Sequence, residues 1–182
     1  MGVTESLKEK FSGSILGGHS FRGDETVVIK KEDVLQVCKF LRDEMGFNFL
    51  TDLTAMDFLN YPEGSSDKKA RFEVVYHLYS LKANTRVRIK APVQGESPKI
   101  DSVVPLWQAA NWLEREVYDM LGISFTGHPD LRRILMYDGF EGHPLRKDYA
   151  FRKRQPRIGY RERVPGAPPP GGAVRELPGR KQ

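Results

Sequence analysis

Alternation of apolar and polar residues predicts strands in the first two thirds of the chain. In Thr85–Ala91 (TRVRIKA), Val87 and Ile89 alternate with basic residues, which is typical of a strand with one face in water. The apolar run Arg71–Leu81 precedes it across only three residues, so the two runs are predicted to form a β-hairpin. Two more strands are predicted at Thr26–Ile29 and Phe47–Phe58.

Two other segments have apolar residues at the three-to-four-residue spacing of an amphipathic helix. The first begins at Glu32 or Asp33 and ends at Gly46. The second begins at Ser102 as N-cap, contains Pro105 in its first turns, runs through Met120 and ends at Gly122. A short amphipathic turn is expected at residues 5–11 and a loop at 13–23, and no regular element is predicted after Gly122.

The element order β-α-β-β-β-α predicts an α+β fold. We expect a two-layer sandwich with helices on one face of a mostly antiparallel sheet, followed by an extended irregular C-terminal segment. The 182 residues are enough for one such domain with an appendage. The predicted divisions are an N-terminal segment (1–24), an α+β core domain (25–122), an irregular docking segment (123–150) and a basic Pro/Gly-rich tail (151–182).

The net charge of +5 belongs to the end of the chain. Residues 146–182 contain 11 Lys or Arg and 3 Asp or Glu, whereas residues 1–145 contain 18 and 21. Because Pro and Gly interrupt the tail, it cannot bury enough apolar surface to fold alone and is expected to stay extended until it meets a partner. Its aromatic residues among basic ones also leave open an RNA-binding module.

Cysteine content and hydropathy exclude several classes of protein. A single cysteine, Cys38, allows no disulfide within the chain and no self-contained iron–sulfur cluster, which usually takes four thiolates. No window approaches the roughly 18 consecutive apolar residues that cross a bilayer, and the N-terminus lacks the apolar stretch of a signal peptide. We therefore expect a reducing, cytosol-facing environment and contact with a membrane only through other proteins.

Three acidic residues of the second helix could indicate acid/base catalysis or a metal site. Glu116 and Asp119 can share a helix face, but Glu114 lies about 200° around from Glu116. An ion-paired helix face is the simpler interpretation, and the expected cationic partners are Arg115, Arg132 and Arg133.

Two histidines, His128 and His143, each follow a glycine and precede a proline. Their spacing matches no zinc motif, so they are predicted to set the chain direction rather than to bind a metal. The sequence also lacks GxGxxG, Walker, Gly-x-Ser-x-Gly and catalytic Cys/His patterns. These absences argue against an independent enzyme, and a metal-dependent hydrolase stays as a further alternative.

Three consecutive blocks carry a family resemblance: Glu114–Phe125 (EREVYDMLGISF), Gly127–Leu135 (GHPDLRRIL) and Asp138–Tyr149 (DGFEGHPLRKDY). They resemble the C-type (30 kDa) subunit family of proton-translocating NADH:quinone oxidoreductase, respiratory complex I. Thr51–Asp57 and Phe72–Leu78 are also similar to it, so the resemblance covers roughly residues 30–150.

The resemblance implies a peripheral-arm protein that is not catalytic alone and that carries no cofactor. FMN, iron–sulfur clusters and quinone would lie in neighbouring subunits, and electron transfer from NADH to quinone, coupled to proton translocation, would occur there. The implied partners are the larger D-type (49 kDa) subunit, which shapes the quinone cavity, and other peripheral-arm subunits, including iron–sulfur subunits. Neither nucleic acid nor a second copy of the chain is an expected partner.

The implied location is the cytoplasmic face of the inner membrane, or the matrix side in an organelle. Equivalent subunits occur in related photosynthetic, F420-dependent and membrane-bound hydrogenase complexes, which remain alternatives.

The resemblance also implies roles for particular residues, none of them catalytic, cofactor-binding or metal-ligating. An interface role is implied for Arg132, Arg133, His143, Arg146, Lys147, Asp148 and Tyr149. A structural role in the motif is implied for Glu114, Arg115, Glu116, Tyr118, Asp119, Gly122, His128, Pro129, Asp130 and Pro144. The alternative that some of the interface residues stabilise the chain's own fold stays open.

Overall fold

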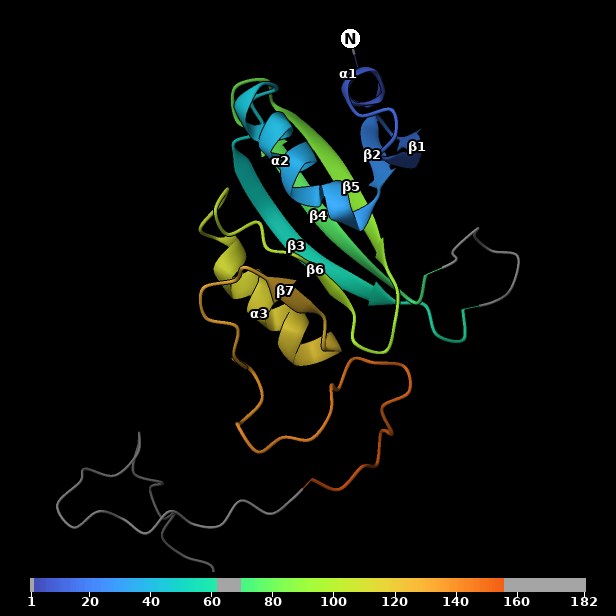
Figure 1. Ribbon diagram of the computed structural model, residues 1–182, viewed down its shortest axis with the longest axis vertical. Coiled ribbons are helices and arrows are strands. Elements are labelled where there is room, and N and C mark those ends of the chain that lie inside the picture. Colours follow the sequence, from blue (N-terminus) through green and yellow to red (C-terminus); the bar gives the residue numbers. More distant parts are fainter. Residues whose placement is uncertain (1, 62–69, 156–182) are drawn as a thin grey trace, which may run out of the picture.

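A computed structural model of the protein describes residues 2–61 and 70–155 (Figure 1). The element order is α1 (Val3–Lys10), β1 (Ile15–Phe21), β2 (Asp24–Ile29), the short 3-10 helix η1 (Lys31–Asp33), α2 (Val34–Asp43), β3 (Phe49–Asp57), β4 (Phe72–Ser80), β5 (Thr85–Val93), β6 (Lys99–Asp101), α3 (Ala110–Leu121) and β7 (Ser124–Thr126). The predicted α+β class is confirmed. Most of the predicted basic tail, residues 156–182, lies outside the described residues.

The main sheet has five strands in the order β1-β2-β5-β4-β3. Only the β2–β5 pair of this sheet is parallel, so the sheet is mostly antiparallel, as predicted. The predicted hairpin is the β4–β5 pair, in which Ser80 lies opposite Thr85.

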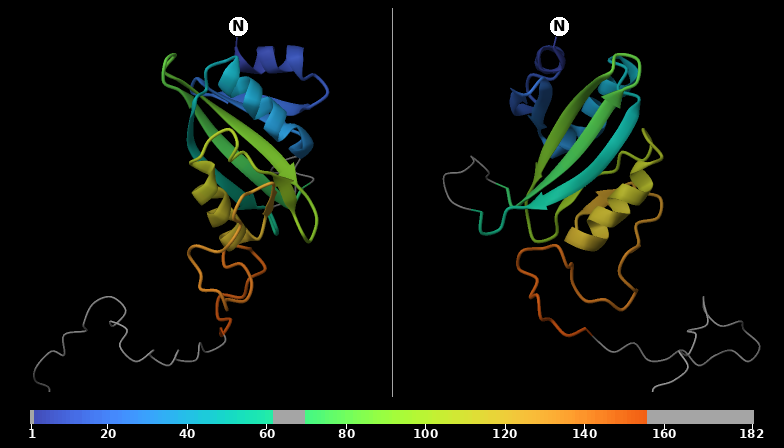
Figure 2. Two further views of the ribbon diagram at one scale, coloured as in Figure 1. Left: turned by 60° about the vertical axis from the view of Figure 1, so that its left-hand side comes forward. Right: turned by 180° about the vertical axis from the view of Figure 1, so that it is seen from behind.

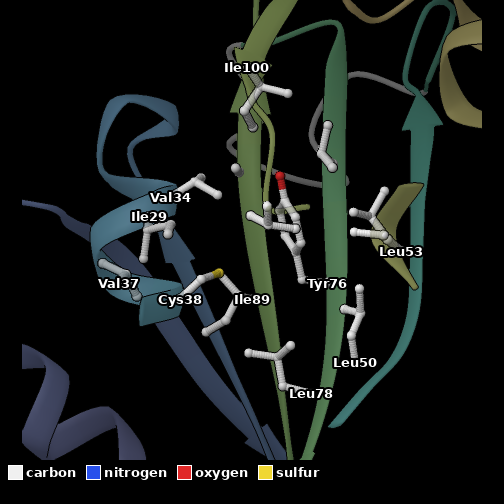
Figure 3. Close-up of a cluster of buried hydrophobic side chains, with 14 of the residues drawn as sticks. Ile29, Val34, Val37, Cys38, Leu50, Leu53, Tyr76, Leu78, Ile89 and Ile100 are labelled. Atoms are coloured by element: carbon white, nitrogen blue, oxygen red, sulfur yellow. The ribbon is translucent and has the colours of Figure 1, made fainter. Parts of the chain in front are cut away.

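One face of this sheet carries the core. Along β5, Val87, Ile89, Ala91 and Val93 are buried, while Arg86, Arg88 and Lys90 alternate with them on the other face. The helices α2 and α3 add buried side chains to the same core, including Cys38 and Val117. Figure 3 shows Cys38 of α2 beside Ile89 of the sheet, with Val34 on the same side of the helix and Tyr76 beyond. The opposite face, seen from behind in Figure 2, has no helix across it within the part of the chain that the structure describes.

The N-terminal part differs from the sequence prediction. Residues 15–21 were expected in a loop but form β1, which pairs with β2 along most of its length. The expected turn at 5–11 is a helix, α1, whose first N–H groups are capped from β2. The Glu25 carboxylate accepts hydrogen bonds from the backbone N–H of Val3 and Thr4 at 3.0 and 2.7 Å. A side chain of one element thus replaces the missing local cap of another.

The second predicted helix is shorter than expected. The helix α3 begins at Ala110 rather than at Ser102, and residues 103–109 form tight turns. Residues 99–101 and 124–126 form a separate parallel two-stranded sheet, β6–β7, which the sequence did not predict. The predicted end at Gly122 is confirmed, because this glycine is the C-cap with φ +72°.

A buried carboxyl fixes the turns that precede α3. Glu114 is 0% exposed, and its Oε1 accepts a hydrogen bond from the N–H of Val103 at 2.7 Å. Its Oε2 and the buried hydroxyl of Tyr76 have no hydrogen-bond partner within the described residues. Burial raises the pKa of Glu114 to about 7, although hydrogen bonds from Ser102 and Val103 act in the opposite direction. Glu114 is therefore a polar group inside the core rather than part of a solvated helix face.

Candidate subunit interface

The buried carboxylate of Asp119, near the end of α3, holds the middle of the docking segment, residues 123–150. Its Oδ2 accepts hydrogen bonds from the backbone N–H groups of Ile134, Leu135 and Met136 at 3.1, 2.8 and 2.9 Å. Its Oδ1 accepts one from Arg133 at 2.7 Å. Burial raises the pKa of this carboxyl, but these hydrogen bonds outweigh burial and leave the pKa below its usual value. Asp119 is thus an ionised anchor for irregular backbone.

Arg133 connects two blocks of the docking segment. One nitrogen, Nη1, pairs with Asp119, while Nη2 donates to the carbonyl of Gly142 at 3.0 Å. The guanidinium also lies 5.8 Å from the ring centre of Phe140, and that ring stacks on Tyr149 at 6.0 Å. The sequence prediction that Arg133 pairs with an acidic residue of the helix is confirmed.

The last carbonyl groups of α3, which have no partner within a helix, are satisfied by residues 143–146. His143 Nδ1 lies 3.0 Å from the carbonyl oxygen of Asp119, and the N–H of Leu145 donates to Met120 at 3.0 Å. Arg146 Nε donates to Leu121 at 2.6 Å. Burial, joined by the nearby charges of Arg146 and Arg133, lowers the pKa of His143, so a neutral ring donates from Nδ1.

Gly122 makes this arrangement possible. Its φ of +72° favours glycine, and a Cβ at this position would lie 2.5 Å from both the His143 ring and Arg146 Nη2. Arg146 Nη2 also donates to the carbonyl of Gly122 at 3.3 Å. Any side chain at this position would therefore displace the two residues that cap α3.

Arg115 and His128 hold the segment along the earlier turns of α3. Arg115 was expected to pair with acidic groups, but its Nε and Nη2 donate to the carbonyls of Arg132 and Arg133 at 3.1 and 3.4 Å. His128 Nε2 lies 3.1 Å from the carbonyl of Asn111, and its Nδ1 accepts from the N–H of Asp130 at 3.0 Å. The histidine thus fixes chain direction through hydrogen bonds at both ring nitrogens.

A second buried carboxylate, Asp57 at the end of β3, holds the far end of the segment. Arg71 donates to both of its oxygens, at 3.1 and 3.0 Å, and also pairs with Asp148 at 2.9 Å. The N–H of Lys147 donates to Asp57 Oδ2 at 2.9 Å. Burial acts to raise the pKa of Asp57, but the hydrogen bonds from Arg71, Leu59 and Lys147 outweigh it and lower the pKa. Asp57 and Arg71 were not singled out from the sequence, because they contact distant residues: Asp57 binds Lys147 across 90 positions, and Arg71 pairs with Asp148.

The residues predicted at an interface fall into two groups. Arg133, His143, Arg146, Asp148 and Tyr149 make the contacts within the chain described above, so they support its own fold. The side chain of Arg132 is 72% exposed and pairs with the exposed Asp130, and Lys147 is also exposed. A contact of any of them with another protein of a complex stays a prediction.

The residues predicted to have a structural role in the motif also divide into those that pack within the chain and those that are exposed. Glu114, Arg115 and Asp119 are buried. Tyr118 contacts the His143 ring at 6.3 Å, and Pro144 is half-buried. Glu116 and Pro129 are exposed, and for them the structure indicates no packing role.

Comparisons with known proteins identify the family. The profile of the family described as "Respiratory-chain NADH dehydrogenase, 30 Kd subunit" matches residues 27–155. The chain belongs to this family. The C-type subunit of the NADH-quinone oxidoreductase of Geotalea uraniireducens is 53% identical over 143 residues, which cover 79% of this chain and 83% of that protein. A C-type subunit of the same enzyme from Rhizobium etli is 42% identical over 181 residues, with 94% and 89% covered.

Solved structures agree with the membership of this family. A trypsin-resistant fragment (1-134) of Nqo5 is 37% identical, with a TM-score of 0.62, and the match covers 72% of this chain and 100% of the fragment. A chain of the membrane-bound sulfane sulfur reductase, an archaeal respiratory membrane complex, shares the fold, with a TM-score of 0.63 at 24% identity over 82% and 84% of the two chains. The predicted resemblance to the 30 kDa subunit family of complex I is therefore confirmed. None of the helices in residues 2–61 and 70–155 is long and apolar enough to cross a bilayer.

Proposed function

We propose that this member of the family is a structural and assembly subunit that docks onto the large quinone-site protein, the D-type (49 kDa) subunit, through its docking segment. The observation that carries the proposal is how the chain uses its buried polar groups. The carboxylates of Asp119 and Asp57 and a carbonyl at the end of α3 all bind the backbone of a segment that has no regular element after Thr126 within the described residues. Ordering such a segment costs conformational entropy during folding. In return, a partner binds a surface that is already fixed and needs no further ordering.

The chain is proposed to contribute geometry rather than chemistry. Within the described residues, no group of three His, Cys, Asp or Glu side chains could hold a metal ion. The buried thiol of Cys38 has its pKa raised to about 12 by burial, so it is not a reactive thiolate at neutral pH. Electron transfer from NADH to quinone then depends on FMN and iron–sulfur clusters in neighbouring subunits, and the chain sits peripherally at the cytoplasmic face of the membrane.

A deletion strain complemented by the full chain tests this proposal. Without the chain, we expect membranes to lose NADH-to-quinone activity, while detached subcomplexes that carry the flavin still oxidise NADH with an artificial electron acceptor. Complementation with an affinity-tagged copy should restore activity and retain the large quinone-site subunit on the affinity resin. Full quinone reduction in the deletion strain would contradict the structural role, and stoichiometric flavin or metal in the purified chain would contradict the absence of a cofactor.

A further inference from the structure

Exposed leucines occur in two parts of the molecule, the docking segment and the main sheet. Leu135 and Leu145 of the docking segment are both 58% exposed, while Leu16 in β1 and Leu81 in the β4–β5 hairpin are 55% and 63% exposed. The docking segment lies beyond the end of the sheet where β3 ends, far from the β4–β5 hairpin (Figure 1). Isolated exposed leucines are ordinary on protein surfaces, so exposure alone does not distinguish the two pairs.

The backbone of the docking-segment pair distinguishes it. The N–H of Leu135 donates to the Asp119 carboxylate at 2.8 Å, and the N–H of Leu145 donates to the carbonyl of the next residue, Met120, at 3.0 Å. Both leucines are therefore held at the same end of α3. Their neighbours Leu131 and Met136 are half-buried against the core, so the segment already presents some apolar side chains inward and leaves these two outward.

The charges of the segment point to the same conclusion. Arg133 and Arg146 are occupied inside the chain, so they are poor candidates for contacts with a partner. Lys147, Arg152 and Arg154 are exposed and form no ion pair within residues 2–61 and 70–155. Apolar side chains on a backbone held by hydrogen bonds, with the exposed cation Lys147 two residues after Leu145 and further exposed cations at Arg152 and Arg154, fit a binding surface with a central apolar anchor and a charged rim.

We propose that Leu135 and Leu145 are the anchors of the interface with the large quinone-site subunit, and that they enter an apolar depression whose rim is acidic. This proposal rests on the proposed function, and it assigns the binding energy to two leucines that the motif charges position. Lys147 and the cations after it contribute chiefly to the rate and salt dependence of association.

The test uses the tagged full chain as the only copy in the cell and compares two double variants of equal chemistry. In Leu135→Ser/Leu145→Ser we expect the amount of the large quinone-site subunit retained from solubilised membranes to fall by about tenfold or more. In the control, Leu16→Ser/Leu81→Ser, we expect retention like that of wild type. Thermal unfolding of both purified variants should match wild type, since all four side chains are more than half exposed.

A third variant, Lys147→Glu, separates anchor from rim. We expect a smaller loss of retention, confined to low salt, because the rim charge is screened by added salt. Wild-type retention by the variant that lacks Leu135 and Leu145, or an equal loss in the control, would overturn the anchor assignment while leaving the docking function intact. Failure of the wild-type chain to retain the large quinone-site subunit would instead overturn the proposed function itself.

Discussion

The sheet domain and the docking segment are held together by different interactions. In the domain, one cluster of buried apolar side chains joins α1, α2, α3 and the main sheet. In the docking segment, backbone N–H and C=O groups are bound by buried charged side chains, chiefly Asp119, Asp57 and Arg115, and the half-buried Arg146 of the segment caps the end of α3. Burial of apolar area is distributed over many contacts, whereas each polar anchor is a single point on which several hydrogen bonds depend.

This difference explains why the docking segment is rich in charged residues and short of periodic apolar ones. A segment without helix or strand must satisfy its backbone groups by other means, and carboxylates, guanidinium groups and a histidine supply them. It also predicts that single polar substitutions release the docking segment without unfolding the domain.

Asp119→Ala should give the largest local effect. It removes the acceptor of three backbone N–H groups and leaves Arg133 without its ion pair, and breaking a buried pair in this way costs about 3–5 kcal/mol. We expect hydrogen exchange at the N–H of Leu145, which the substitution does not touch directly, to accelerate strongly, while exchange in β4 stays near the wild-type rate. Equal acceleration in both places would show that segment and domain unfold together.

The pH dependence of the same contact has a defined sign. The pKa of Asp119 is lowered in the folded protein. Its contribution to the stability of the folded protein is therefore present above the ordinary pKa of 3.8 and is lost as the pH falls through the folded pKa. Acid should therefore release the docking segment in wild type. Asp119→Asn, which keeps one acceptor, should show a weaker attachment that no longer depends on this titration.

Glu114→Gln should have the next largest effect, in the domain and with the opposite pH dependence. The pKa of Glu114 is raised from 4.5 to about 7 in the folded protein. The folded protein therefore has its full stability below pH 4.5, where Glu114 is neutral, and loses stability as the pH rises through about 7 and the buried carboxyl ionises. The loss amounts to about 3 kcal/mol at about 1.4 kcal/mol per pH unit. Denaturant unfolding should show the variant more stable than wild type near pH 8 and similar near pH 4. The exposed Glu116→Gln is the matched control, and a variant with the wild-type pH profile would contradict the assignment.

The regular elements with local signals were predictable from the sequence. The hairpin of β4 and β5 and the helix α2 each have their own apolar period and their own terminating residues, and all three are present. The strand β1 was missed because Leu16-Gly17-Gly18-His19 has low strand propensity, and its pairing with β2 supplies what the local sequence lacks. The β6–β7 pair was missed for the same kind of reason, since two three-residue strands meet only through the tertiary fold.

The candidate site was predictable in its residue types but not in their roles. Opposite charges in consecutive motif blocks, such as Asp119 and Arg133, suggested an ion pair, which the structure confirms. The sequence could not show that Arg115 binds carbonyl groups, that Glu114 lies in the core, or that Asp57 reaches the docking segment. These roles depend on burial and on contacts between distant residues, which local patterns do not encode.

Lys153→Ala should give the smallest effect, because Lys153 is an exposed charge just beyond the docking segment rather than a buried anchor. Lys153 pairs with Glu141 at 3.6 Å, with side chains 36% and 62% exposed, and exposed pairs contribute about 1 kcal/mol or less. We expect hydrogen exchange at Leu145 to change little, whereas Arg133→Ala, which removes a half-buried cation of the same segment, should approach the effect of Asp119→Ala. If both cation variants released the segment equally, burial would not be what makes an anchor, and the segment would be held by charge attraction alone.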